Sequence, residues 1–257
     1  MSYSSKKESV VDKIVEICCG SYEDALMAYQ GGAKRIELNS ALFLGGLTPT
    51  ISSLLLTKKH TDLEVVAMAR PRGGGFCYST ADFESMVLDA ELLLQHGADG
   101  IAFGCLEKSC RIDKVQTKEM LSVIKQNKGY GVFHRAFDCV DDPYGAMEEL
   151  IELGVKRVLT SGLQAKAIDG VDLIADLQKK FGAHIELLAG SGVNVGNARL
   201  IMEKTGIHQV HSSCKSWITD ETTIGKYVSY SYAGSPHEKD YETVSAKLVK
   251  NLLESVR

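Results

Sequence analysis

The sequence lacks any uninterrupted apolar run of the roughly eighteen residues that a membrane-spanning helix needs, so we expect no membrane partner. It also lacks a run of basic residues: 29 lysines and arginines stand against 33 acidic residues, for a net charge of −4. That balance argues against nucleic acid as a partner. Residues 1–13 carry no apolar stretch of signal-peptide length and predict a flexible N-terminal tail. We therefore expect a cytoplasmic protein.

The cysteines lack the spacing of a disulfide framework or of a zinc site. There are seven, an odd number, and no two of them form a CxxC pair. In a chain without a secretion signal, such cysteines are expected to be reduced thiols. The composition, with 44% hydrophobic and 24% charged residues, is that of an ordinary soluble protein with one large core.

One short sequence motif recurs along the chain: a helix ends at glycine, and an apolar strand begins within about three residues. Two further apolar segments, residues 14–18 and 64–70, lack this motif but also predict strands. The motif occurs at least six times, as GGAKRIEL, HGADGIAF, GYGVFH, LGVKRVLT, FGAHIELL and TGIHQVHS.

These eight strands alternate with helical segments, whose start signals include Ser21 with Asp24, Ser79 with Asp82, Thr48 with Pro49, Asp142 with Pro143, and Asn194. Such alternation forces parallel pairing through right-handed crossovers, and eight units close into a barrel. We predict a single (β/α)8 TIM barrel, of the α/β class, over residues 14–257. The main rival is an open doubly wound sheet, although the first strand–helix turn, CCGSYED, lacks the GxGxxG fingerprint of a dinucleotide site.

The segment 214–240 is polar, rich in Ser, Thr and Tyr, and far longer than a typical loop between strand and helix. Two interpretations stay open: a loop that caps the barrel mouth, or a disordered excursion. The last helix is expected over residues 241–256.

Function in such barrels lies at the carboxyl ends of the strands, where this sequence places several charged side chains. Alternate residues of a strand share a face, so Glu16 lies on the same face as Cys18, and Glu37 lies on the same face as Asn39. The candidates for general acid and base chemistry are Glu16, Glu37, His134 and Asp138.

An excess of arginine at this rim, together with two glycine-rich loops, predicts an anionic ligand such as a phosphate or carboxylate. An internal salt-bridge network that only fills the top of the barrel is the alternative. The predicted anion-binding residues are Arg70, Arg72, Arg135, Ser161, Gly190, Ser191, Gly192 and His211.

Cytosolic Cu(I) is held by two or three sulfur ligands, which makes Cys18 and Cys19 the candidate metal ligands. Core packing is the alternative for a lone strand cysteine. No organic cofactor is predicted.

Several long motifs, EICCGSYEDALMAYQGGAKRIELNSALFLGGLTPT, ARPRGGGFCYS, GVFHRAFD, RVLTSG and VHSS, resemble the CutC family of copper homeostasis proteins from Ile14 to Ser213. The resemblance implies a cytoplasmic (β/α)8 barrel, a homo-oligomer (dimer or tetramer), and a copper-associated role. It also implies that Cys18 is the cysteine of the family's first strand. Two departures stand out: Asn39 replaces a cysteine that ends the second strand in many relatives, and AGSG replaces PGGG after the seventh strand.

The leading hypothesis is therefore a copper-binding homeostasis protein. The alternative is an enzyme of unknown reaction that acts on a small anionic substrate at the barrel mouth. A third hypothesis, an interaction scaffold, has no particular support in the sequence.

Overall fold

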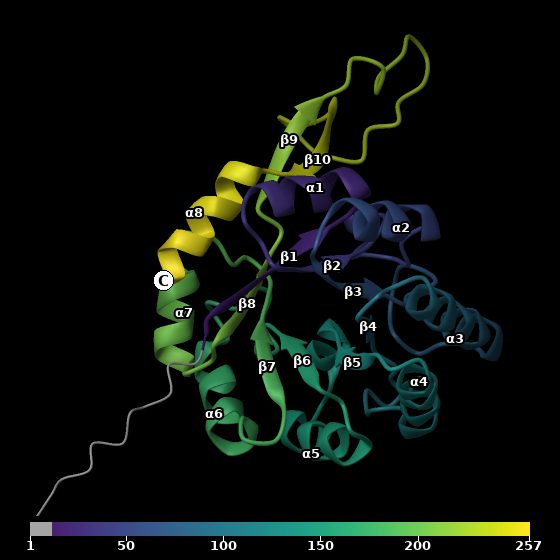
Figure 1. Cartoon of the computed structure of the whole chain (residues 1–257), viewed down its shortest axis with the longest axis vertical. Helices are drawn as coiled ribbons and strands as arrows, with labels where there is room; N and C mark the ends of the chain where they lie inside the picture. The colour runs from purple at the N-terminus through teal and green to yellow at the C-terminus, as the bar shows by residue number, and fades with distance from the viewer. Residues whose placement is uncertain (1–11) are drawn as a thin grey trace, which may run out of the picture.

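A computed structural model describes residues 12–257, and the predicted tail lies largely outside the described residues. Eight parallel strands, in the order β1 to β8, close into a barrel that is ringed by helices, which confirms the predicted fold (Figure 1). The strands are β1 (Ile14–Cys19), β2 (Arg35–Leu38), β3 (Glu64–Met68), β4 (Gly100–Phe103), β5 (Tyr130–Phe133), β6 (Arg157–Thr160), β7 (Glu186–Ala189) and β8 (Gln209–Ser212).

Helices follow the strands in turn, and most begin where the sequence predicts. Ser79 and Asp82 form a capping box that starts α3, and Asp142 caps α5 with Pro143 as its first residue. None of the helices over residues 12–257 is both long and apolar enough to cross a membrane. The helices are α1 (Tyr22–Gln30), α2 (Ile51–His60), α3 (Thr80–Gln95), α4 (Lys114–Gln126), α5 (Pro143–Leu153), α6 (Val171–Phe181), α7 (Ala198–Thr205) and α8 (Ala246–Val256), with short 3-10 turns η1 (Leu42–Leu44) and η2 (Arg135–Cys139).

Two predicted helix starts are displaced along the chain. Thr50, two residues after Thr48, accepts a hydrogen bond from the Ser53 amide and caps α2. Asn194 forms a turn with Asn197, which precedes α7. In both cases a polar residue that can cap a helix instead shapes the loop before it.

The main apolar core lies between the strands and the surrounding helices, where side chains such as Ile17, Ile36 and Phe133 are fully buried. Inside the barrel the apolar cluster is small and comes from β3, β4 and β5. Elsewhere in the interior, charged side chains lie among other buried polar and apolar ones. Arg35 Nε lies 2.6 Å from Glu16, and Arg157 NH2 lies 2.7 Å from Glu186. Because these groups pair with one another, their burial costs much less than that of isolated charges.

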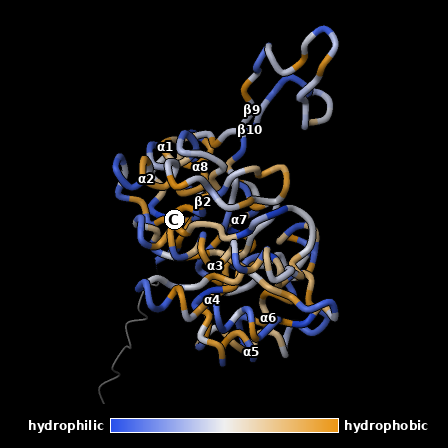
Figure 2. The backbone as a smooth tube through the Cα atoms, turned by 90° about the vertical axis from the view of Figure 1, so that its right-hand side faces the viewer, coloured by the Kyte–Doolittle hydropathy of each residue, from blue (hydrophilic) through white to orange (hydrophobic). Residues whose placement is uncertain are grey.

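The polar segment after β8 forms an antiparallel hairpin of β9 (Lys215–Thr219) and β10 (Asp240–Val244). Figures 1 and 2 show the hairpin and its connecting loop projecting beyond the barrel. Only its base reaches the mouth, through Lys215 and Glu242. Both earlier interpretations therefore need correction, because most of the segment projects away from the mouth and its two ends pair as the strands β9 and β10. The last helix begins at Ala246 rather than at 241, since the preceding residues pair as a strand.

Candidate functional site

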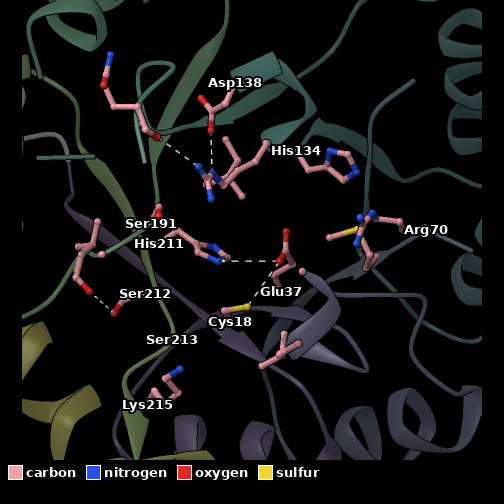
Figure 3. A pocket seen from close by; sticks show the side chains of 18 of the residues that line it. Cys18, Glu37, Arg70, His134, Asp138, Ser191, His211, Ser212, Ser213 and Lys215 are labelled. Atoms are coloured by element: carbon pink, nitrogen blue, oxygen red, sulfur yellow. Dashed lines mark hydrogen bonds and ion pairs between the residues drawn. The ribbon is translucent and has the colours of Figure 1, made fainter. Parts of the chain in front are cut away.

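A cavity of about 730 Å³ opens at the carboxyl ends of the barrel strands (Figure 3). Its walls come from most of the barrel strands, from the loops that follow them, and from the hairpin base. Several predicted site residues line it: Cys18, Glu37, Arg70, His134, Arg135, Asp138, Ser191, Gly192 and His211.

Three potential metal ligands meet on one side of this cavity. Cys18 on β1 lies opposite Glu37 on β2 in the strand register, and His211 comes from β8, the other neighbour of β1. One ligand atom of each residue lies within 4.8 Å of the others. Adjacent strands thus bring a thiol, a carboxylate and an imidazole to one point. Asn39 joins them, since its Nδ2 lies 3.0 Å from Glu37 Oε2 and 3.7 Å from Cys18 Sγ.

The protonation of this cluster follows from burial and from mutual contacts. Burial raises the pKa of the Cys18 thiol to about 11 and also raises the pKa of Glu37. Burial alone would lower the pKa of His211. Hydrogen bonds with Cys18 and Glu16 and the charge of Glu37 instead raise it well above the usual range. A metal that binds here therefore has to displace protons.

Glu16 lies beneath the cavity rather than in its wall. It is only 1% exposed and contacts Arg35, Arg157 and His211 within the barrel. The prediction that Glu16 is a catalytic residue at the mouth needs correction, because His211 lies over it and it faces the buried arginines. Its contact with His211 links it to the site indirectly.

Cys19 also lies away from the cavity. Because strand residues alternate, its side chain points out of the barrel toward the helices, where it is fully buried. We withdraw Cys19 as a candidate metal ligand.

His134, at the end of β5, lines the cavity and is buried. Burial and the nearby charge of Arg70 lower its pKa to about 3, so the imidazole is neutral near pH 7. Its Nδ1 accepts a hydrogen bond from the Ala136 amide at 3.1 Å. The proton of the neutral ring is therefore on Nε2, which has no hydrogen-bond partner among the described residues.

The arginines of the loop after β3 have different surroundings. Arg70 lines the cavity, and its terminal nitrogens donate to the carbonyls of Leu44, Gly46 and Gly74. Arg72 lies outside the cavity, where it bonds Asp82 and carbonyls of its own glycine-rich loop. The prediction that Arg72 binds an anion therefore needs correction, because its N–H groups already donate to Asp82 and to backbone carbonyls of the loop.

Asp138 is occupied by structural contacts, which argues against its predicted catalytic role. Its carboxylate accepts from Thr160 Oγ1 at 2.6 Å and from the Ser161 amide at 2.9 Å, and it pairs with Arg135 at 2.8 Å. Arg135 NH2 also donates to Ser161 Oγ. Ser161 is fully buried and does not line the cavity. This cluster ties η2 to the loop after β6 rather than presenting free groups to an anion.

The glycine turn after β7 contributes only in part. Ser191 and Gly192 line the cavity, but the Ser191 hydroxyl donates to the Ala165 carbonyl at 2.7 Å. Gly190 lies behind the wall, where an added Cβ would come within 2.6 Å of the Leu159 side chain. The prediction that Gly190 binds an anion therefore needs correction, since tight packing explains why this position has no side chain.

Sequence reasoning missed two parts of the site. The first is the base of the hairpin, where Lys215 and Glu242 form an ion pair of 3.2 Å at the cavity rim. The second is the pair Arg35 and Arg157 below Glu16. Each stands at the beginning of a strand, away from the carboxyl ends where function is expected in such a barrel. The odd presence of arginine in a buried strand was the available signal.

The family model of the CutC family matches residues 13–216 of this chain. The chain belongs to the CutC family. A CutC family protein of Treponema denticola is 44% identical over 243 residues, which cover 93% of this chain and 98% of the relative. A human relative is 39% identical over 203 residues, covering 79% of this chain and 74% of that protein. The crystal structure of a CutC protein from Streptococcus agalactiae superposes with a TM-score of 0.74 at 26% identity, covering 78% of this chain and 98% of that one.

Proposed function

We propose that the protein takes part in copper homeostasis in the cytoplasm and binds a copper ion through Cys18, Glu37 and His211. The observation that supports this most is the convergence of their ligand atoms within 4.8 Å at the barrel mouth. The human and mouse relatives carry the name copper homeostasis protein cutC homolog, which favours the same role. Assembly into a dimer or tetramer stays a prediction.

The donor set suits copper on chemical grounds. Thiolate is the soft ligand that favours Cu(I), and imidazole is an accepted partner for copper in either oxidation state. Because position 39 carries an asparagine and not a cysteine, Cys18 supplies the sulfur ligand of this cluster. His211 Nε2 and a Glu37 oxygen are the other two proposed ligands. With His211 Nδ1 directed at Glu16 at 2.9 Å, Nε2 is the nitrogen that faces Glu37.

The test is an anaerobic Cu(I) titration of purified protein against a competing chelator, comparing Cys18→Ser with Cys19→Ser. We expect wild type and Cys19→Ser to bind one Cu(I) per chain with micromolar or tighter affinity, and Cys18→Ser to bind at least about tenfold more weakly. Cys19 is the matched control because it neighbours Cys18 in sequence but faces the helices. Equal binding by both variants would contradict the proposal.

The size of the cavity favours a second candidate function. A volume of about 730 Å³ far exceeds what one ion needs. It falls in the range of roughly 300–1,000 Å³ that is typical of small-molecule sites. The second candidate is an enzyme or receptor for a small anionic molecule, and it concerns the side of the cavity away from Cys18.

A further inference from the structure

Arg70 is a buried cation without a carboxylate partner among residues 12–257. Its exposed fraction is 4%. The two arginines inside the barrel differ in this respect, since Arg35 pairs with Glu16 at 2.6 Å and Arg157 with Glu186 at 2.7 Å. A buried charge is costly unless an opposite charge balances it. The contrast indicates that the counter-charge of Arg70 comes from a ligand.

The contacts of Arg70 hold its guanidinium in place without neutralising it. NH1 donates to the Leu44 carbonyl at 2.9 Å and to the Gly46 carbonyl at 2.8 Å, and NH2 donates to Gly74 at 2.7 Å. Carbonyl oxygens satisfy donors but carry no net charge. Nε is buried and has no partner in the described part of the chain. The side chain is thus fixed at the cavity wall, while the N–H of Nε, the second N–H of NH2 and the positive charge stay uncommitted.

His134 supplies a further uncommitted donor nearby. Its Nδ1 accepts from the Ala136 amide, which leaves the proton on Nε2, and no described residue accepts from that nitrogen. Phe76 connects the two residues: the Arg70 guanidinium carbon lies 5.3 Å from the Phe76 ring centre, and the His134 ring centre lies 5.0 Å from it. All three side chains line the cavity, and Figure 3 shows Arg70 and His134 on the side away from Lys215 and Ser212.

We propose that Arg70 and His134 bind the carboxylate group of a small organic monocarboxylate. Both uncommitted groups are donors, so the ligand atoms have to be acceptors. One guanidinium and one neutral imidazole balance a single negative charge, which fits a carboxylate better than a phosphate dianion. Phe76 offers an apolar surface to the carbon atoms next to the carboxylate, and the cavity leaves space for a molecule of several more atoms.

This proposal names the ligand class of the second candidate function and is independent of copper. It also narrows the predicted anion-binding set, which included Arg70, Arg72 and the glycine turn after β7, to the wall formed by Arg70 in the loop after β3 and His134 at the end of β5. The reason is that the charge there is unbalanced, whereas the turn residues are already bonded or packed.

The test is isothermal titration of the full chain, prepared without metal, with acetate, pyruvate, inorganic phosphate and chloride near pH 7. We expect saturable binding of acetate or pyruvate and no comparable binding of phosphate or chloride. His134→Leu removes the Nε2 donor and should weaken carboxylate binding about tenfold or more, because a hydrogen bond to a charged group is lost. His134→Gln keeps a donor and should retain most of the affinity. Arg72→Gln is the matched control, since Arg72 lies on the same loop as Arg70 but outside the cavity. This variant should bind the carboxylate with the same affinity as wild type.

A second readout reports on His134 itself. In nitrogen-15 NMR spectra, the bound carboxylate should shift the Nε2 resonance of His134 and leave Nδ1 nearly unchanged, because Nδ1 stays bonded to Ala136. Binding of phosphate but not of carboxylates would overturn the ligand class and leave the second candidate function standing. No binding of any of these anions would overturn both. Carboxylate binding that survives in His134→Leu would overturn the assignment to this wall.

Discussion

His211 Nδ1 lies 2.9 Å from Glu16 Oε1 inside the barrel, and the exposed fractions of the two residues are 8% and 1%. Burial opposes the ionisation of Glu16. The hydrogen bond from His211 and the charges of Arg35 and Arg157 outweigh it and lower the pKa of Glu16 to about 2. A carboxylate fixed in this way holds the imidazole ring in one orientation, with Nε2 toward Glu37 and Cys18. In metal sites such a carboxylate behind a histidine also increases the basicity of the ligand.

Glu16→Gln should therefore weaken Cu(I) binding without removing a ligand. The amide keeps the size of the side chain but not its charge, so His211 becomes a poorer and less oriented donor. We expect the affinity to fall by about 10–100-fold, as is typical when such an outer partner is changed. The measurement is the chelator competition described for Cys18.

Glu186→Gln is the control for this prediction. Glu186 also pairs with a buried arginine, Arg157, but it does not contact His211. Glu16→Gln breaks a buried ion pair and should cost about 3–5 kcal/mol of unfolding free energy at most, whereas Glu186→Gln should cost less because the Glu186 side chain is 38% exposed. Only Glu16→Gln should change the affinity for copper. If both variants bind copper as wild type does, the Glu16 contact is purely structural.

Asn39 gives the second prediction, because it stands at the end of the second strand, where the resemblance to the CutC family implies a cysteine in many members, and lies beside Cys18. Its Nδ2 lies 3.7 Å from Cys18 Sγ, close enough that a sulfur at this position could share a metal with Cys18. Asn39→Cys should raise the affinity for Cu(I) about tenfold or more, since a second thiolate suits this soft ion. Asn39→Ser, which removes the amide without adding sulfur, should not raise it. An equal affinity in the two variants would show that a metal does not lie between positions 18 and 39.

Much of the fold could be predicted because it depends on local rules. The glycine that follows most of the helices, the apolar strand after it, and caps such as Ser79 are short-range features. The strand β10 was missed because its alternation is weak: residues 240–244, DYETV, carry two acidic side chains, and only Val244 is buried. A hairpin that projects from the barrel has no core that would impose a clear pattern.

The candidate site could be predicted only in part. Alternation along a strand predicts which side chains point into the barrel, but not how far below the cavity each of them lies. Cys18 and Glu16 share a face of β1, yet Cys18 reaches the cavity and Glu16 lies below it. In the loop after β3 the alternation no longer holds, so Arg70 points into the cavity and Arg72, after Pro71, turns to Asp82. Which charges neutralise one another depends on the barrel register. That register brings Glu16 level with Arg35 and His211, and no local pattern encodes it.

His134 gives the third prediction, which concerns stability in acid. Burial, together with the charge of Arg70, lowers the pKa of His134 to about 3 in the folded protein, whereas an unfolded chain has a histidine pKa of about 6.5. Below pH 6.5 the unfolded state takes up a proton that the folded state does not. The contribution to stability is therefore fully present above pH 6.5 and is lost as pH falls toward 3, by about 1.4 kcal/mol per pH unit.

The measurement is the free energy of unfolding in urea at pH 7, 6, 5 and 4 for wild type and His134→Gln. Other groups titrate in the same range but are shared by the two proteins, so their difference isolates position 134. Wild type should lose stability more steeply than the variant between pH 6.5 and 4, because glutamine takes up no proton in either state. Parallel curves would mean that His134 takes up its proton as readily in the folded protein as in the unfolded chain. In that case most of the rings would carry a second proton, on Nδ1, at pH 6, and the neutral imidazole on which the carboxylate site depends would be the minor form there.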